Sequence, residues 1–219
     1  MKAKQHVIIL INGKRRSGKG ILSQGLKKLL TKQFEDNIHI LSFAEPIKKI
    51  TEPILDEIEW DKKDKEVVRP LWIAMGEVGR NINNNIWCGR VFERITQIAE
   101  ESAKQNKNSL FIIDDLRFPN ELDYFKKHLK DIQLIVDPTK EKHLARVISI
   151  RIEKFMDANK FIPGVDDNST EISFDKLVNL VFDYIVPQNT LINEELVADF
   201  KGVEVVAKLL VENFIKNNG

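Results

Sequence analysis

Apolar residues along this chain form short runs that alternate with segments of helical periodicity. A near-continuous run rich in Val and Ile covers 6–12, which is typical of a central parallel strand buried on both faces. From Lys19 to Phe34 the apolar positions recur at three- and four-residue spacing, which predicts a helix. Further strands are expected at 38–43, 109–114, 132–136 and 183–186, and further helices from Pro46, at 70–76, 87–104, 121–128, 141–158 and 194–216. This alternation predicts an α/β fold, a mostly parallel five-stranded sheet with helices on both faces.

Composition supports one globular domain over 1–219. With 42% hydrophobic and 31% charged residues, the chain can build a packed core, and disordered or collagen-like classes are disfavoured. The formal net charge of +1 gives no overall basic field, so we expect no nucleic-acid partner and no membrane-surface binding. Any positive site must be local.

The single cysteine, Cys88, can form no intrachain disulfide and offers no metal-site spacing, which fits a reducing compartment. The N-terminal apolar run 7–11 is far too short to span a membrane. We therefore expect a soluble cytoplasmic protein with small-molecule partners. Association into a homodimer stays open.

The segment after the first strand matches the first seven positions of the G-x-x-x-x-G-K-[ST] phosphate loop. Such a loop points backbone N–H groups and a helix N-terminus at phosphate oxygens, so we expect ATP as the ligand and Lys19 on its terminal phosphates. The expected ATP-binding residues are Gly13, Lys14, Arg16, Ser17, Gly18, Lys19, Gly20 and Ile21. Gly20 replaces the hydroxyl that usually binds Mg²⁺, so Asp115 becomes the candidate metal residue, acting through water. The alternative is a basic turn that merely caps a helix.

Four later segments, together with the loop, resemble the deoxynucleoside monophosphate kinases of tailed bacteriophages. They are 42–48 (SFAEPIK), 69–72 (RPLW) running on to Gly76, Arg80 and Trp87, 115–121 (DLRFPNE), and 169–171 (STE) with 182–186 (FDYIV). The resemblance implies a P-loop NTPase three-layer sandwich that uses ATP and Mg²⁺ to phosphorylate a deoxynucleoside 5′-monophosphate in the host cytoplasm. It also places monophosphate binding in a helical region at about 44–104. The chain departs from the family at Gly20, often Asp there, and at Asn168, where His is often expected.

Phosphoryl transfer needs positive charge and alignment more than covalent chemistry, and ligands bind beyond the carboxyl ends of parallel strands. Lys19, Lys48 and Arg117 each follow a predicted strand. We therefore expect Lys19, Arg117 and Asp115 to be catalytic, and Lys48, with Arg69 and Arg80, to bind the acceptor. For each of these charges the alternative is an ordinary solvated side chain, and for Asp115 it is the cap of the following turn.

Aromatic residues and a lid complete the expected site. Phe43, Trp72 and Trp87 could stack on a base, although aromatic residues at helical spacing are often core residues. A helical lid at about 141–170 would carry Arg146 and Arg151 and exclude water from the reaction. The alternative for this arginine pair is an amphipathic surface helix with salt bridges.

Two other functions remain open at this point. One is a P-loop kinase for another small phosphorylated acceptor such as phosphomevalonate, whose animal kinases share a similar loop without the usual Ser or Thr. The other is a non-catalytic nucleotide-binding module, which Gly20 makes plausible.

Overall fold

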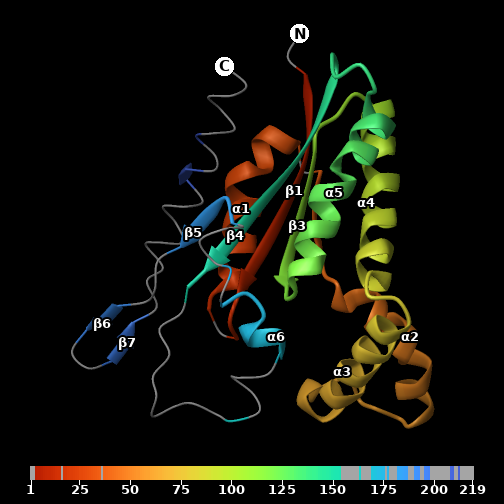
Figure 1. Cartoon of the computed structure of the whole chain (residues 1–219), viewed down its shortest axis with the longest axis vertical. Coiled ribbons are helices and arrows are strands. Elements are labelled where there is room, and N and C mark those ends of the chain that lie inside the picture. Colours follow the sequence, from red (N-terminus) through yellow and green to blue (C-terminus); the bar gives the residue numbers. More distant parts are fainter. Residues whose placement is uncertain are drawn as a thin grey trace.

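A computed structural model describes residues 3–15, 17–35, 37–153, 163, 169–175, 177, 182–186, 190–192, 195–197, 208–209 and 212 (Figure 1).

The centre of the fold is a five-stranded sheet in the order β2-β3-β1-β4-β5. Its strands are β1 (Lys4–Gly13), β2 (Ile38–Leu41), β3 (Ser109–Leu116), β4 (His143–Ile152) and β5 (Tyr184–Val186). Every neighbouring pair in this sheet is parallel, so all five carboxyl ends meet at one edge. The predicted α/β class and five-stranded parallel sheet are confirmed.

Three helices connect β2 to β3. They are α2 (Ala44–Glu57), α3 (Lys65–Ile82) and α4 (Ile86–Lys104). The Asp64 side chain caps α3 by accepting the Glu66 N–H at 3.0 Å. In Figure 1, α2 and α3 lie beyond the edge where the strand arrows end. They therefore stand next to the edge at which a parallel sheet binds its ligands.

Helices cover both faces of the sheet and give three layers (Figure 1). Side chains of β1 alternate between the faces, because successive residues of a strand point in opposite directions. Val7, Ile9 and Ile11 share a core with α1 (Lys19–Phe34), and Ile8 and Leu10 share one with α4 and α5 (Pro119–Val136). The run 6–12 is therefore buried on both sides, as its composition predicts.

The expected strand at 132–136 and the expected helix at 141–158 are wrong. Helix α5 continues to Val136, and the strand begins at His143 after a turn. The turn is fixed by Asp137, whose carboxylate accepts the N–H groups of Lys142 (2.7 Å) and His143 (3.1 Å). Ten residues of β4 then pair with β1, and this long-range pairing overrides the local helical pattern.

The expected helical lid at about 141–170 is also wrong over 143–152, which is β4. Residues 154–162 and 164–168 lie outside the described residues, and α6 (Ser169–Ile172) follows them. The helix expected at 194–216 is wrong at its start, where β7 (Glu195–Val197) pairs antiparallel with β6 (Thr190–Ile192). Of the rest of that range the structure describes 208, 209 and 212, which are helical.

Cys88 is buried in α4, and burial raises the pKa of its thiol to about 12. The thiol is therefore protonated at neutral pH, which makes it unreactive. No helix in the described ranges combines the length and the apolar character needed to cross a membrane.

Candidate functional site

The phosphate loop joins β1 to α1 at the carboxyl edge of the sheet. At Gly13 a Cβ atom would lie 2.5 Å from Ser17 Oγ and 3.1 Å from the Ile152 carbonyl oxygen, so only glycine fits. Gly18 precedes α1 with a φ of 92°, a left-handed conformation that favours glycine. The two glycines of the motif thus let the backbone wrap tightly in front of a helix N-terminus, which is the geometry that binds phosphate.

Lys19 lies in the first turn of α1 and folds back over the loop. Its Nζ donates to the carbonyl oxygens of Gly13 (2.7 Å) and Lys14 (2.9 Å). Burial, and next the positive charge of Arg117, lower the pKa of Lys19 to about 8. The carboxylates that oppose this shift are Glu171, Asp114 and Asp115. Lys19 therefore shares one electrostatic environment with the end of β3 and with α6.

Two aspartates end β3 and face different helices. The Ser23 hydroxyl on α1 donates to Asp114 Oδ2 at 3.0 Å, and burial raises the pKa of Asp114. Asp115 accepts the Ser42 hydroxyl (2.6 Å) and two backbone N–H groups at the start of α2 (2.9 and 3.1 Å). Asp115 thus caps α2, whereas Asp114 faces the helix that follows the phosphate loop. Asp114 was not among the site residues predicted from the sequence, since the segment 115–121 begins at Asp115.

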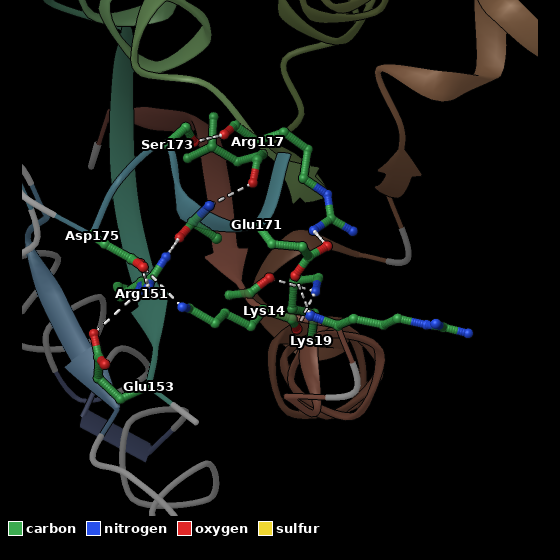
Figure 2. Close-up of polar contacts among 12 residues, drawn as sticks. Lys14, Lys19, Arg117, Arg151, Glu153, Glu171, Ser173 and Asp175 are labelled. Atoms are coloured by element: carbon green, nitrogen blue, oxygen red, sulfur yellow. Dashed lines mark hydrogen bonds and ion pairs between the residues drawn. The ribbon is translucent and has the colours of Figure 1, made fainter. Parts of the chain in front are cut away.

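Arg117 is held at three points. Its N–H donates to Glu121 Oε2 at 2.7 Å. Its carbonyl oxygen accepts the Ser173 hydroxyl, and its Nη1 donates to Glu171 Oε1 at 2.7 Å (Figure 2). The other oxygen of Glu171 accepts the Arg15 N–H of the phosphate loop at 2.6 Å. Burial is the main cause that raises the pKa of Glu121 to about 7. Arg117 is therefore aligned by Glu121 of α5 and by residues 169–175, which comprise α6 and the turn after it and are called the α6 segment below.

A second ion-pair network lies at the end of β4. Arg151 donates to Asn12, to Asp175 Oδ1 (3.1 Å) and to Glu153 Oε1 (3.2 Å). Asp175 Oδ2 also accepts Lys14 Nζ at 2.8 Å, so this carboxylate links the phosphate loop to β4 (Figure 2). Arg151 is almost completely buried, which excludes the lid assignment for it.

Arg146 is likewise a strand residue and not part of a lid. It pairs with Val7 in the register of β4 and β1, five positions before Arg151 in the sequence. The carboxyl end of β4 lies at the candidate site. Arg151 is therefore close to the site, and Arg146 lies nearer the amino end of the strand. The surface-helix alternative for the pair fails for the same reason.

Three of the expected acceptor residues, Lys48, Trp72 and Arg80, lie together on α2 and α3. Lys48 Nζ lies 5.2 Å from the centroid of the Trp72 ring, and the Arg80 guanidinium carbon lies 4.7 Å from that of Phe118. Trp60 packs edge-on against Trp72 with ring centroids 5.9 Å apart. Both basic side chains are thus placed by aromatic rings, a favourable contact for a cation. Trp60 was not expected in the site, because its charged surroundings resemble a solvated connection.

Three other expected acceptor residues have structural contacts instead. Phe43 is buried against Phe125, and Trp87 is buried with its indole N–H donating to the Gly76 carbonyl oxygen at 2.9 Å. Neither ring can stack on a base, so that assignment is wrong for both. Arg69 forms an ion pair with Glu66 one turn earlier in α3 (3.6 Å), as a solvated side chain would.

The remaining residues of the loop differ in their surroundings. Gly20 is exposed with nothing within 4 Å of a Cβ placed there, and Ile21 is half exposed. The Ser17 hydroxyl is buried and has no partner in the part of the chain that the structure describes. Arg16 lies outside the described residues. The loop therefore keeps a polar group that phosphate oxygens could satisfy.

Metal binding at this edge depends on few protein ligands. Among the described residues, no three His, Cys, Asp or Glu side chains come together to hold an ion. Asp114 and Asp115 adjoin the loop, and Mg²⁺ commonly binds through one or two carboxylates with substrate phosphates and water. The donor set therefore fits Mg²⁺ bound together with a nucleotide.

Comparison with known proteins finds similarity to kinases. Solved structures similar to this chain include thymidylate kinase from Ehrlichia chaffeensis (16% identity, 94% of this chain and 99% of that chain, TM-score 0.42). A fungal RNA kinase matches at 12% identity (99% and 89%, TM-score 0.43), and shikimate kinase from Aquifex aeolicus at 13% (95% and 98%, TM-score 0.37). Residues 11–131, more than half of the chain, match the family model for phosphomevalonate kinase. The matched range begins at the end of β1 and includes the whole phosphate loop, Asp114 and Arg117.

Proposed function

Since the chain belongs to the phosphomevalonate kinase family and is a P-loop kinase, we propose that it transfers the γ-phosphoryl group of ATP to the phosphate of a small phosphorylated acceptor. The products are ADP and the corresponding diphosphate. The observation that carries this proposal is that Glu171 bonds both Arg117 Nη1 (2.7 Å) and the Arg15 N–H of the phosphate loop (2.6 Å), so that Arg117 lies beside the loop that leads to Lys19. Two cations, one after β1 and one after β3, can contact the same moving phosphoryl group from two sides.

The loop residues suit the ATP side of the reaction. The N-terminus of α1, which begins directly after Gly18, offers backbone N–H groups to the phosphates. Lys19 needs only to exchange its two carbonyl partners for phosphate oxygens. Asp114 and the nucleotide phosphates would hold Mg²⁺, which would neutralise negative charge on the phosphates during transfer.

The acceptor side requires charge but no catalytic base. The attacking oxygen belongs to a phosphate that is mostly ionised at neutral pH, since its second pKa is about 6. That oxygen forms the new bond to the γ-phosphorus as the bond to the bridging oxygen of ADP breaks. The cations proposed to hold the acceptor phosphate are Arg117, which precedes Phe118 in the sequence, and Arg80, whose guanidinium lies over the Phe118 ring.

Two acceptors belong to this class. The family match favours phosphomevalonate. The segments 42–48 and 115–121, together with the partly exposed Trp72 ring beside Lys48 and Trp60, favour a deoxynucleoside 5′-monophosphate, whose base can stack on an aromatic ring. Both reactions convert a phosphate to a diphosphate, so the same cations serve either one.

A panel of acceptors separates these candidates. We would measure ADP release from Mg-ATP with dAMP, dGMP, dCMP, dTMP and phosphomevalonate supplied one at a time. Release that requires one of the nucleotides and is lost in Trp72→Ala supports nucleotide monophosphate kinase activity. Release that requires phosphomevalonate and is unchanged in Trp72→Ala supports the other acceptor.

Two variants test whether the measured release depends on the proposed site. Lys19→Ala should remove acceptor-dependent release, and Arg117→Ala should lower it strongly without abolishing it. Binding of ATP without release for any phosphorylated acceptor would contradict the proposal and favour a non-catalytic nucleotide-binding module.

A further inference from the structure

We propose that Glu171 is a positioning residue for phosphoryl transfer. It holds the Arg117 guanidinium in place and connects it to the phosphate loop at Arg15. This inference rests on the proposed kinase function and deepens it. It concerns a residue between β4 and β5, 54 positions after Arg117 in the sequence, which lies outside the range matched by the family model.

The contacts of Glu171 join two parts of the site. One carboxylate oxygen accepts Arg117 Nη1 at 2.7 Å, and the other accepts the backbone N–H of Arg15 at 2.6 Å (Figure 2). One side chain thus fixes the distance between the loop that holds ATP and the arginine after β3. Such spacing matters because a misplacement of about 1 Å can cost on the order of 100-fold in rate.

Burial makes this contact stronger than a surface ion pair. The Glu171 side chain is 3% exposed and that of Arg117 is 24% exposed. Exposed ion pairs contribute little, whereas a buried carboxylate with two charge-assisted hydrogen bonds defines a single geometry. The Arg117 side chain has no other hydrogen bond or ion pair within the described ranges, so Glu171 alone orients its guanidinium.

The neighbouring residues hold the rest of the segment. Ser173 donates to the Arg117 carbonyl oxygen, and Asp175 pairs with Lys14 and Arg151. These contacts fix the α6 segment, which carries Glu171, to the carboxyl ends of β3 and β4. The carboxylate is therefore presented to Arg117 from a fixed backbone.

The first test is a kinetic cycle with Glu171→Ala, Arg117→Ala and the double variant. We expect Glu171→Ala to lower kcat on the order of 10- to 100-fold while the Kd for ADP changes less than about threefold. In the Arg117→Ala background the same substitution should have almost no further effect on kcat, because its partner is absent. Glu171→Asp, which keeps the charge, should recover part of kcat.

The matched control is Glu100→Gln, which breaks an exposed Glu–Lys pair on α4 and should leave kcat unchanged. A parallel loss of kcat and of ADP affinity in Glu171→Ala would overturn the proposal and assign Glu171 to loop stability through Arg15. A full additional loss in the Arg117→Ala background would overturn it as well.

The second test does not depend on turnover. Restricted rotation of the Arg117 guanidinium should give separate Nη signals in the nitrogen NMR spectrum of the wild-type protein, and Glu171→Gln should merge them. Signals already merged in the wild type would overturn the proposal. A wild-type protein that turns over no phosphorylated acceptor but shows separate signals would contradict the proposed function alone.

Discussion

At the scale of single residues, Lys19 carries a positive charge in surroundings that disfavour its protonated form. Its ammonium group is partly buried beside Arg117, which lowers its pKa to about 8 from an ordinary value of 10.5. The unfolded chain therefore binds more protons than the folded one between pH 8 and 10.5, and stability should rise with pH in that window. The charge that is proposed to bind phosphate is present below pH 8, where it opposes folding most.

Lys19→Met tests this opposition. At pH 7 the variant should unfold at a higher temperature than the wild type, because an uncharged side chain replaces a poorly solvated cation. The difference should shrink at pH 10, and acceptor-dependent ADP release should be lost at both values. Thermal unfolding at the two pH values measures the effect, and an equal or lower unfolding temperature for the variant at pH 7 would contradict it.

Gly20 offers a second test at a single position. A Cβ placed there meets nothing within 4 Å, so Gly20→Ser can restore the hydroxyl of the usual phosphate loop without strain. We expect the Mg²⁺ concentration for half-maximal rate to fall by roughly 2- to 10-fold, since one further ligand is supplied. A Mg²⁺ titration of ADP release measures this.

The control for Gly20→Ser lies on the same helix. Gly25 also has nothing within 4 Å of an added Cβ, so Gly25→Ser adds the same atoms away from the loop. An equal shift in both variants would mean that a more stable α1, and not the new hydroxyl, caused the effect.

The two glycines of the phosphate loop were predictable from the sequence because the conformation of the backbone there requires them. The loop between β1 and α1 needs glycine at two fixed positions, and a short motif records that need. Glu171 acts through a contact with Arg117, 54 positions earlier, and no spacing rule encodes such a pair. Phe43 and Trp87 failed as base-stacking residues because their burial depends on helices that pack from elsewhere in the chain.

At the scale of elements, β4 shows how far a local pattern can mislead. The number of parallel strands was predicted correctly, but the fourth was placed at 132–136, which is the end of α5. The apolar side chains there continue the buried face of the helix, with Ile132 and Val136 four residues apart. What makes 143–152 a strand is its ten-residue pairing with β1, which is a property of the assembled sheet.

The turn that separates α5 from β4 provides the prediction at this scale. Hydrogen bonds from Thr139, Lys142 and His143 hold the pKa of Asp137 well below its ordinary value of 3.8. Its contribution to stability is therefore present above about pH 4 and is lost as pH falls further. Asp137→Asn should lower the unfolding temperature at pH 7 and flatten the acid side of the stability profile.

Asp123→Asn, an exposed substitution on α5, is the control and should change neither quantity. Thermal unfolding between pH 7 and pH 3 checks both variants. An Asp137→Asn protein that remains as stable as the wild type at pH 7 would show that the turn is not fixed by this carboxylate.

At the scale of the whole molecule, the two edges of the sheet differ in chemistry. The carboxyl edge carries the phosphate loop, Arg117 and the α6 segment. The amino edge carries a buried histidine pair, with His6 Nε2 3.0 Å from His143 Nδ1 and His6 Nδ1 2.8 Å from Ser109 Oγ. These residues join the starts of β1, β3 and β4, so they influence the sheet without touching the candidate site.

The histidine pair should set the acid limit of the fold. Burial, and next the charge of His143, lower the pKa of His6 from 6.5 to about 4. The unfolded chain therefore gains a proton between pH 6.5 and pH 4 that folded His6 does not, and stability should fall by on the order of 3 kcal/mol across that window.

His6→Gln should lose less stability between pH 6.5 and pH 4.5 than the wild type, although it starts from a lower value at pH 7. The matched control is His128→Gln, which removes a half-buried histidine of α5 outside the pair. Urea unfolding at the two pH values measures the slope, and ADP release at pH 7 should remain at the wild-type rate in His6→Gln because the pair lies at the far edge. If His6→Gln retained the full wild-type slope, the acid sensitivity would have to come from carboxylates elsewhere in the chain and not from this pair.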